Sequence, residues 1–177
     1  MLFDPAVYGK AVAEILALDG NGSRLMPLAG GQCSSEAAKA VLGKVRAHEL
    51  FPASRAAEAA LSGLWLYFSC LDESHKVSQD VLTAEGTFWH GILHRQEPDP
   101  GNAGYWFRRL GTHPVFPRIA EEAATLGYGR SGHWDALAFV DYCEQARRDP
   151  GSEAERSAMR VQLIEWQVLF DYCASAA

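Results

Sequence analysis

The sequence predicts an all-α protein, a compact array of about eight or nine helices built from antiparallel helical hairpins. Residues that commonly cap helices precede several of its apolar segments, as Asp4-Pro5 and Ser152 do. Long apolar segments such as residues 54–70 lack the alternation of a half-buried strand. Few β-branched runs bounded by hairpin turns occur, and no sheet is therefore expected.

Nine segments carry these helical signals. Ser34 or Ser35 caps the second segment, an acidic first turn at Asp72 opens the fourth, and Asp99 or Asn102 caps the sixth. The third segment is a continuous Ala- and Leu-rich stretch, whereas the last two are amphipathic at helical spacing. In chain order, the expected helices cover residues 4–18, 34–48, 54–70, 72–82, 88–97, 103–110, 117–126, 134–148 and 152–174.

The length of 177 residues predicts a single domain. We divide this domain into three parts along the chain. Residues 1–52 hold the N-terminal helices and a loop, residues 53–126 the central hairpins, and residues 127–177 the C-terminal helices.

Charge and hydropathy exclude several classes of protein. The formal net charge of −6 argues against binding nucleic acid or an anionic membrane through bulk electrostatics. No run of about eighteen apolar residues predicts a membrane span, and residues 1–5 lack the pattern of a secretory signal. The four cysteines form no Cys-x-x-Cys pair. We therefore expect a soluble cytoplasmic protein with reduced thiols and without nucleic-acid or membrane partners.

Residues that can carry chemistry are concentrated in one segment, residues 89–114, with the sequence WHGILHRQEPDPGNAGYWFRRLGTHP. On a helix, His90 and His94 lie one turn apart on one face, which Glu97 continues. Imidazoles at this spacing can share a divalent metal such as zinc, with Glu97 as an oxygen ligand or as a general base.

A third protein ligand has to come from elsewhere, and His113 and His75 are the candidates. Position 91 is Gly, so the His-Glu-x-x-His arrangement of zinc proteases is absent. The alternative is that His90 and His94 lie in a polar seam between helices and bind no metal.

The same segment is locally basic in an acidic protein, and such a cluster favours an anionic ligand held by arginine. In the alternative, Arg108 and Arg109 are solvated or pair with Glu97 and Asp99. The candidate ligand-binding residues are Arg95, Asn102, Tyr105, Arg108, Arg109 and His113.

A weak internal repeat indicates a different class of protein. Residues 63–82 align with residues 91–110 without a gap, at an offset of 28. The second copy is similar to a tetratricopeptide hairpin, with small residues at the helix contact, a large residue in the groove and a terminating proline. Those positions are Gly91, Ala103, Phe107 and Pro114. Any packed helical hairpin could share this pattern.

The central motif, WHxxxHRxExDxxNxxYWFRRxGxHP, resembles a family of uncharacterised helical proteins from bacteria and fungi. Later landmarks are Trp134-Asp135 with Phe139-Val140-Asp141, and Glu165-Trp166 with Leu169-Phe170-Asp171. The resemblance covers residues 57–173 and implies no activity.

Two functions follow as hypotheses. In the first, the His/Glu/Arg segment forms one polar pocket that binds a small anionic ligand or a divalent metal, with hydrolase-like activity. In the second, the protein is a non-catalytic tetratricopeptide-like scaffold for a protein partner.

Overall fold

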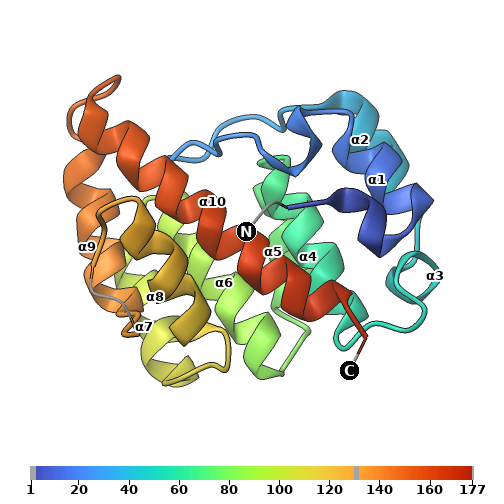
Figure 1. Ribbon diagram of the computed structural model, residues 1–177. Coiled ribbons are helices and arrows are strands. Elements are labelled where there is room, and N and C mark those ends of the chain that lie inside the picture. Colours follow the sequence, from blue (N-terminus) through green and yellow to red (C-terminus); the bar gives the residue numbers. More distant parts are fainter. Residues whose placement is uncertain (1–2, 130–131, 177) are drawn as a thin grey trace.

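The computed structural model describes residues 3–129 and 132–176 and confirms the all-α prediction (Figure 1). The first two residues of the segment searched for a secretory signal lie outside this description, as do residues 130, 131 and 177. Ser54 and Ala176 form an isolated antiparallel bridge, and the described residues contain no strand. The α-helices are α1 (Lys10–Leu16), α2 (Glu36–Leu42), α3 (Ala47–Leu50), α4 (Ala57–Tyr67), α5 (Leu71–Ser78), α6 (Ala84–Gln96), α7 (Pro100–Leu110), α8 (Phe116–Thr125), α9 (Ala136–Ala146) and α10 (Glu153–Ala174), with short 3-10 helices η1 (Pro5–Tyr8) and η2 (Gly20–Gly22).

The described residues thus form ten α-helices rather than eight or nine. The segment expected as one helix over residues 34–48 divides, because α2 ends before Gly43 and α3 begins at Ala47. The first expected helix also breaks at Gly9, whose φ of 98° is left-handed. In contrast, α6 begins four residues earlier than expected, since the hydroxyl of Thr83 caps it by accepting from the Gly86 amide.

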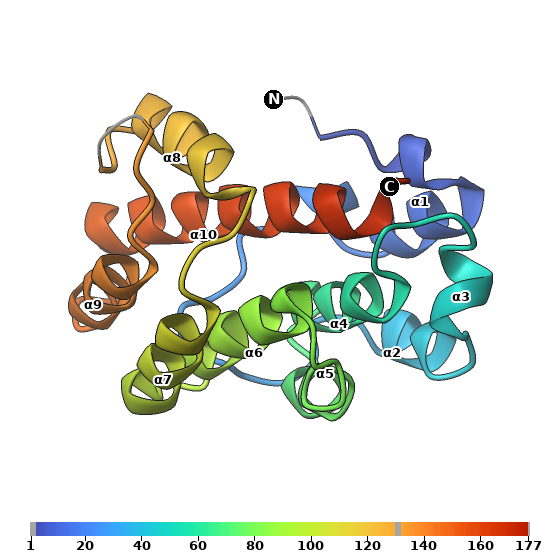
Figure 2. The ribbon, with the colours of Figure 1, turned by 90° about the horizontal axis from the view of Figure 1, so that it is seen from below.

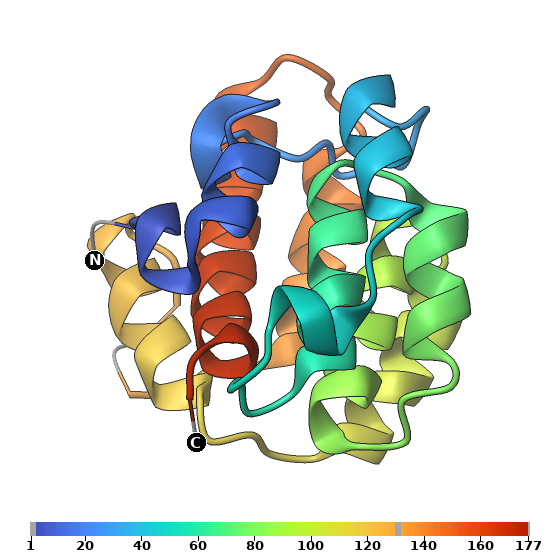
Figure 3. The same ribbon diagram turned by 90° about the vertical axis from the view of Figure 1, so that its right-hand side faces the viewer.

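The long helix α10 runs across the middle of the molecule (Figure 2). Helix α8 lies on one side of it, and α4, α6 and α9 lie on the other. Figure 3 shows α4 and α5, the two helices of one hairpin, side by side. None of the described helices combines the length and the apolar character that a bilayer span requires.

Two antiparallel hairpins, α4–α5 and α6–α7, form the centre of the fold. Helix α6 packs against α4, α5 and α7, and every residue from Gly86 to Gln96 is buried. Glycines permit the close contacts: a Cβ at Gly63 would lie 2.7 Å from Trp89, and one at Gly91 would lie 2.9 Å from Phe107. The Gly91–Phe107 contact is the one that the tetratricopeptide pattern requires, although repeat descent stays a prediction.

A buried ion pair joins α6 to α10. The Arg95 guanidinium donates to the Glu165 carboxylate, and both side chains are fully buried. Arg95 also donates to Gln162 at 3.4 Å, and its guanidinium lies 4.5 Å from the centre of the Phe139 ring. Arg95 was a candidate ligand-binding residue, but this pairing places it in the core.

The expectation of reduced thiols is wrong for two of the four cysteines. A disulfide joins Cys33 to Cys70, whose Cα atoms are 4.5 Å apart. The irregular segment that follows η2 returns to the corner between α4 and α5, which brings together two residues 37 positions apart in sequence. Cys143 and Cys173 are free, as expected, and both are buried.

Replacing Glu165 by Gln should lower the free energy of unfolding by about 3–5 kcal/mol, because it leaves the Arg95 charge buried without a counter-charge. The double substitution Arg95→Met/Glu165→Leu should recover most of this loss. Urea unfolding followed by circular dichroism measures both. As a control, Arg156→Gln removes an ion pair with the exposed Glu153 and should leave stability unchanged. A Glu165→Gln protein as stable as the wild type would contradict the prediction.

Candidate metal centre

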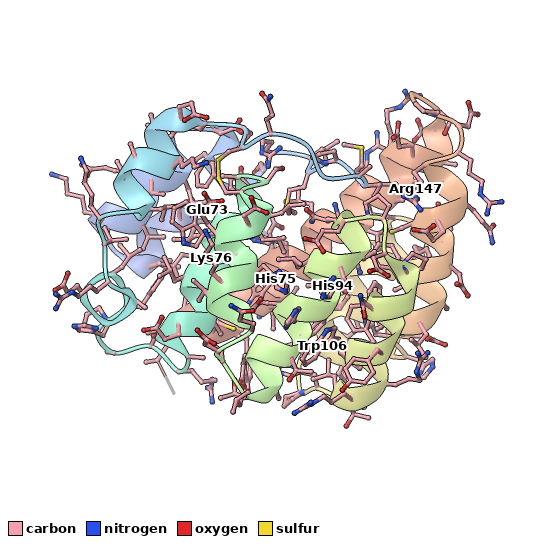
Figure 4. The ribbon with its side chains drawn as sticks, turned by 180° about the vertical axis from the view of Figure 1, so that it is seen from behind. Glu73, His75, Lys76, His94, Trp106 and Arg147 are labelled. Atoms are coloured by element: carbon pink, nitrogen blue, oxygen red, sulfur yellow. A yellow bond between two sulfur atoms is a disulfide. The ribbon has the colours of Figure 1, made fainter. Side chains whose placement is uncertain are left out.

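Three histidines from two neighbouring helices meet in the seam between α5 and α6. His75 comes from α5, whereas His90 and His94 lie one turn apart on α6. One possible ligand atom from each imidazole lies within 4.8 Å of the other two. The ring centroid of His75 is 4.8 Å from that of His90 and 5.3 Å from that of His94. Figure 4 shows His75 and His94 side by side on their two helices.

The packing of α6 dictates which of its faces carries the histidines. Successive residues are about 100° apart around a helix, so His90 lies midway between Trp89 and Gly91. Trp89 contacts α4 at Gly63, and Gly91 contacts α7 at Phe107. His90 and His94 therefore face the remaining neighbour, α5, where His75 lies.

Trp106 of α7 covers one side of this cluster. Its ring stacks on the His90 imidazole, with 4.0 Å between centroids and 16° between planes. His90 in turn stacks on His94 at 4.8 Å. His90 and His94 are 4% and 8% exposed, while His75 is half-buried and forms the open side of the cluster.

Burial and the neighbouring histidines keep the imidazoles of His90 and His94 neutral. Burial, together with the nearby His94 and His75, lowers the pKa of His90 to about 4. Burial also lowers the pKa of His94, although the Glu97 carboxylate opposes that effect. The nitrogen lone pairs of both are therefore available at neutral pH, as metal coordination requires.

Glu97 lies behind His94 and is not grouped with the three possible ligands. Its Oε2 is 2.9 Å from Nδ1 of His94. The two groups are close, but their directions do not suit a hydrogen bond, and Nδ1 of His94 has no hydrogen-bond partner. A small rotation of the ring would align the N–H with the carboxylate and leave Nε2 of His94 for a ligand.

The cluster is too open for a metal in its present geometry. Tetrahedral zinc, with Zn–N bonds of about 2.0–2.1 Å, requires nitrogen atoms about 3.4 Å apart. Rotation of the half-buried His75 toward the other two rings would reduce the larger separations. Three imidazoles would then leave a fourth position for water or a substrate.

His113, the other candidate for third ligand, lies elsewhere. Its ring contacts Phe88 and Tyr172, and its Nε2 is 3.8 Å from Glu85. Phe88 is about 160° around α6 from His90, so His113 packs against the opposite side of that helix. The sequence named both His75 and His113, and the structure groups His75 with His90 and His94.

The predicted anion-binding residues do not converge on the histidines. Asn102 donates to Asp99 at 2.7 Å and belongs to the cap of α7. Tyr105 and Arg108 are exposed on α7, as is Arg109, whose guanidinium lies 5.4 Å from the Trp106 ring centre. Arg108 does share a cavity of about 520 Å³ with His113, but that cavity lies between α7, α8 and the start of α9.

Comparison with protein-family models, curated proteins and solved structures finds no match. The family resemblance of the central motif therefore stays a prediction.

The metal-free protein should lose stability as the pH falls from about 6.5 to about 4. The folded pKa of His90 is below its ordinary value, so the unfolded chain binds more protons in this range. The free energy of unfolding should fall by up to about 1.4 kcal/mol per pH unit for each such proton.

Urea unfolding in the presence of a chelator, repeated across this pH range, measures the effect. His90→Gln should flatten the pH dependence, and His48→Gln, at an exposed position, should not. Equal slopes in the wild type and His90→Gln would contradict the assignment.

Proposed function

We propose that the protein binds one divalent metal ion through His75, His90 and His94. The observation that carries the proposal is the approach of three imidazoles within 4.8 Å in a largely buried seam. Neutral imidazoles lose their hydrogen bonds to water when they are buried beside one another. This burial is costly unless their nitrogen atoms find another partner, such as a metal ion. An all-nitrogen set favours zinc, with copper, nickel or iron as competitors.

Glu97 has a supporting role in this proposal. Metal-ligating histidines commonly donate their other ring N–H to a carboxylate, which fixes the ring and raises its basicity. Glu97 is positioned to do this for His94, since Nδ1 and Oε2 are 2.9 Å apart. We therefore propose that Glu97 orients His94, in place of the role of ligand or general base that the sequence suggests.

Three protein ligands and an open fourth position are typical of catalytic rather than structural zinc sites. His75 is half-buried and is the most exposed of the three ligands, so we place the open position on its side. A metal there would polarise a substrate or activate water, which is the chemistry of hydrolases. We therefore propose that the metal-bound site has hydrolase-like activity.

The scaffold hypothesis finds support in the way α6 packs against both helices of the preceding hairpin, as stacked repeats do. The concave surface of such a stack would be lined by its first helices, α4 and α6. Helix α10 crosses both, because Trp166 donates to Gly63 at 2.8 Å and Glu165 pairs with Arg95. The chain itself occupies the place of a bound peptide, and this favours the metal site.

Protein purified without a histidine tag should bind about one equivalent of zinc. Ala at position 75, 90 or 94 should weaken binding by more than about 100-fold, because loss of a supporting partner alone costs about 10–100-fold. Competition with a chromophoric chelator measures affinity, and elemental analysis measures stoichiometry. His113→Gln and His48→Ala are the controls and should bind as the wild type does. A wild-type protein that binds neither zinc nor cobalt, nickel, copper or iron would overturn the proposal.

Glu97→Gln should lower zinc affinity by about 10–100-fold while keeping the stoichiometry, because the amide holds His94 less strongly. The same chelator competition measures this change. Glu85→Gln is a matched control, since Glu85 lies at the other end of α6, near His113. If Glu97→Gln abolished the stoichiometric metal altogether, Glu97 would be a ligand rather than an orienting residue.

A further inference from the structure

An irregular segment, residues 23–35, bridges the two helices that carry the histidines; we call it the strap. The Gly30 amide donates to the carbonyl of Gln96, the last residue of α6. A Cβ on Gly30 would collide with Leu71, the first residue of α5. The strap is thus packed between the start of α5 and the end of α6, where Leu71 is four residues before His75 and Gln96 is two residues after His94.

Two links hold the far end of the strap. The Ser34 amide donates to the Phe68 carbonyl at 2.7 Å, and the disulfide joins Cys33 to Cys70. Cys70 directly precedes α5, five residues before His75. The covalent bond therefore ties the strap to the corner from which the His75 helix starts.

The disulfide is accessible from one side. Cys33 is half-buried whereas Cys70 is only 2% exposed, so a reductant in solution reaches the Cys33 sulfur first. Both cysteines line a cavity of about 580 Å³, a volume within the range of small-molecule pockets. Glu97, whose carboxylate lies beside His94, lines the same cavity. The cavity therefore extends from the disulfide to the surroundings of the histidine cluster.

We propose that Cys33–Cys70 is a thiol–disulfide exchange site for a low-molecular-weight thiol, and that its oxidation state sets the affinity of the histidine cluster for metal. The second half of this proposal rests on the proposed function. The disulfide holds the strap against α5 and α6 and so keeps the three imidazoles close. Reduction releases Cys33 and lets the strap withdraw from both helix ends.

The exchange balances with two thiols. The thiolate of the first attacks the Cys33 sulfur, a mixed disulfide forms, and Cys70 leaves as a thiolate that takes up a proton. The second thiolate attacks the sulfur of the bound small thiol and displaces the Cys33 thiolate, which is also protonated. The protein gains two electrons and two protons, and the two small thiols leave as their disulfide.

The start of the strap is attached independently of the disulfide. Gln162 of α10 donates to the Met26 carbonyl at 3.0 Å, and both Met26 and Leu28 are buried. Reduction should therefore loosen residues 29–35 and the adjoining helix ends without unfolding the core.

The test compares the oxidised protein with protein treated with reduced glutathione. Alkylation under denaturing conditions should label two cysteines before treatment and four after it. Hydrogen exchange should become faster in the strap, in the first turn of α5 and in the last turn of α6. Zinc affinity should fall about tenfold, as for loss of a supporting contact.

New thiols can bind zinc themselves, so Cys33→Ser/Cys70→Ser provides the reduced geometry without them. This variant should bind zinc as weakly as, or more weakly than, the reduced wild type and should ignore glutathione. Cys33→Ala/Cys70→Ala serves if the serine variant does not fold, because it also removes both thiols. Cys143→Ala is the matched control and should respond as the wild type does.

The outcomes separate the two proposals. A disulfide that glutathione does not reduce, or a strap whose hydrogen exchange is the same in both forms, would overturn the exchange site and its effect. Loosening of the strap with equal zinc affinity in both forms would overturn the coupling. If neither form bound metal while the strap still loosened, the exchange site would stand and the proposed metal function would fall.

Discussion

The absence of a side chain at Gly63 sets how α6 lies in the molecule. Trp89 packs directly on this glycine, and Trp166 of α10 donates to its carbonyl at 2.8 Å. Because one face of α6 is fixed there, the other faces follow at helical spacing. His90 and His94 turn to α5, Arg95 turns to Glu165, and Phe88 turns to His113. A larger residue at position 63 would shift α6 and disturb all three contacts together.

The histidine cluster opposes folding on its own, because neutral imidazoles are taken out of water beside one another. Trp106 offsets part of this cost by stacking on His90. The buried imidazoles can all be satisfied in one arrangement, in which a further partner binds to their free nitrogen atoms. The site is therefore a part of the core in which polar residues occupy positions that normally hold apolar ones. Functional residues are expected at such positions.

The helical class and most helix starts could be predicted from the sequence, since caps such as Asp135 and Ser152 act through adjacent residues. The i, i+4 spacing likewise indicated His90 and His94. The choice between His75 and His113 could not be made, because it depends on the rotation of α6 within the packed molecule. Arg95 was misplaced for a related reason: its partner, Glu165, is 70 positions away. The Cys33–Cys70 disulfide also depends on the path of an irregular segment, which capping and periodicity do not encode.

The Cys33–Cys70 bond also gives the chain a covalent ring. The ring encloses α2, α3 and α4 and leaves η1, α1 and η2 on one side and α5 to α10 on the other. A protease that cut the exposed residues Gly43 or Lys44 would open the ring without separating the chain. The two fragments would run as one species on a denaturing gel without reductant and as two species with it. The disulfide therefore keeps the N-terminal helices covalently attached to the histidine helices after the backbone between them has been cut.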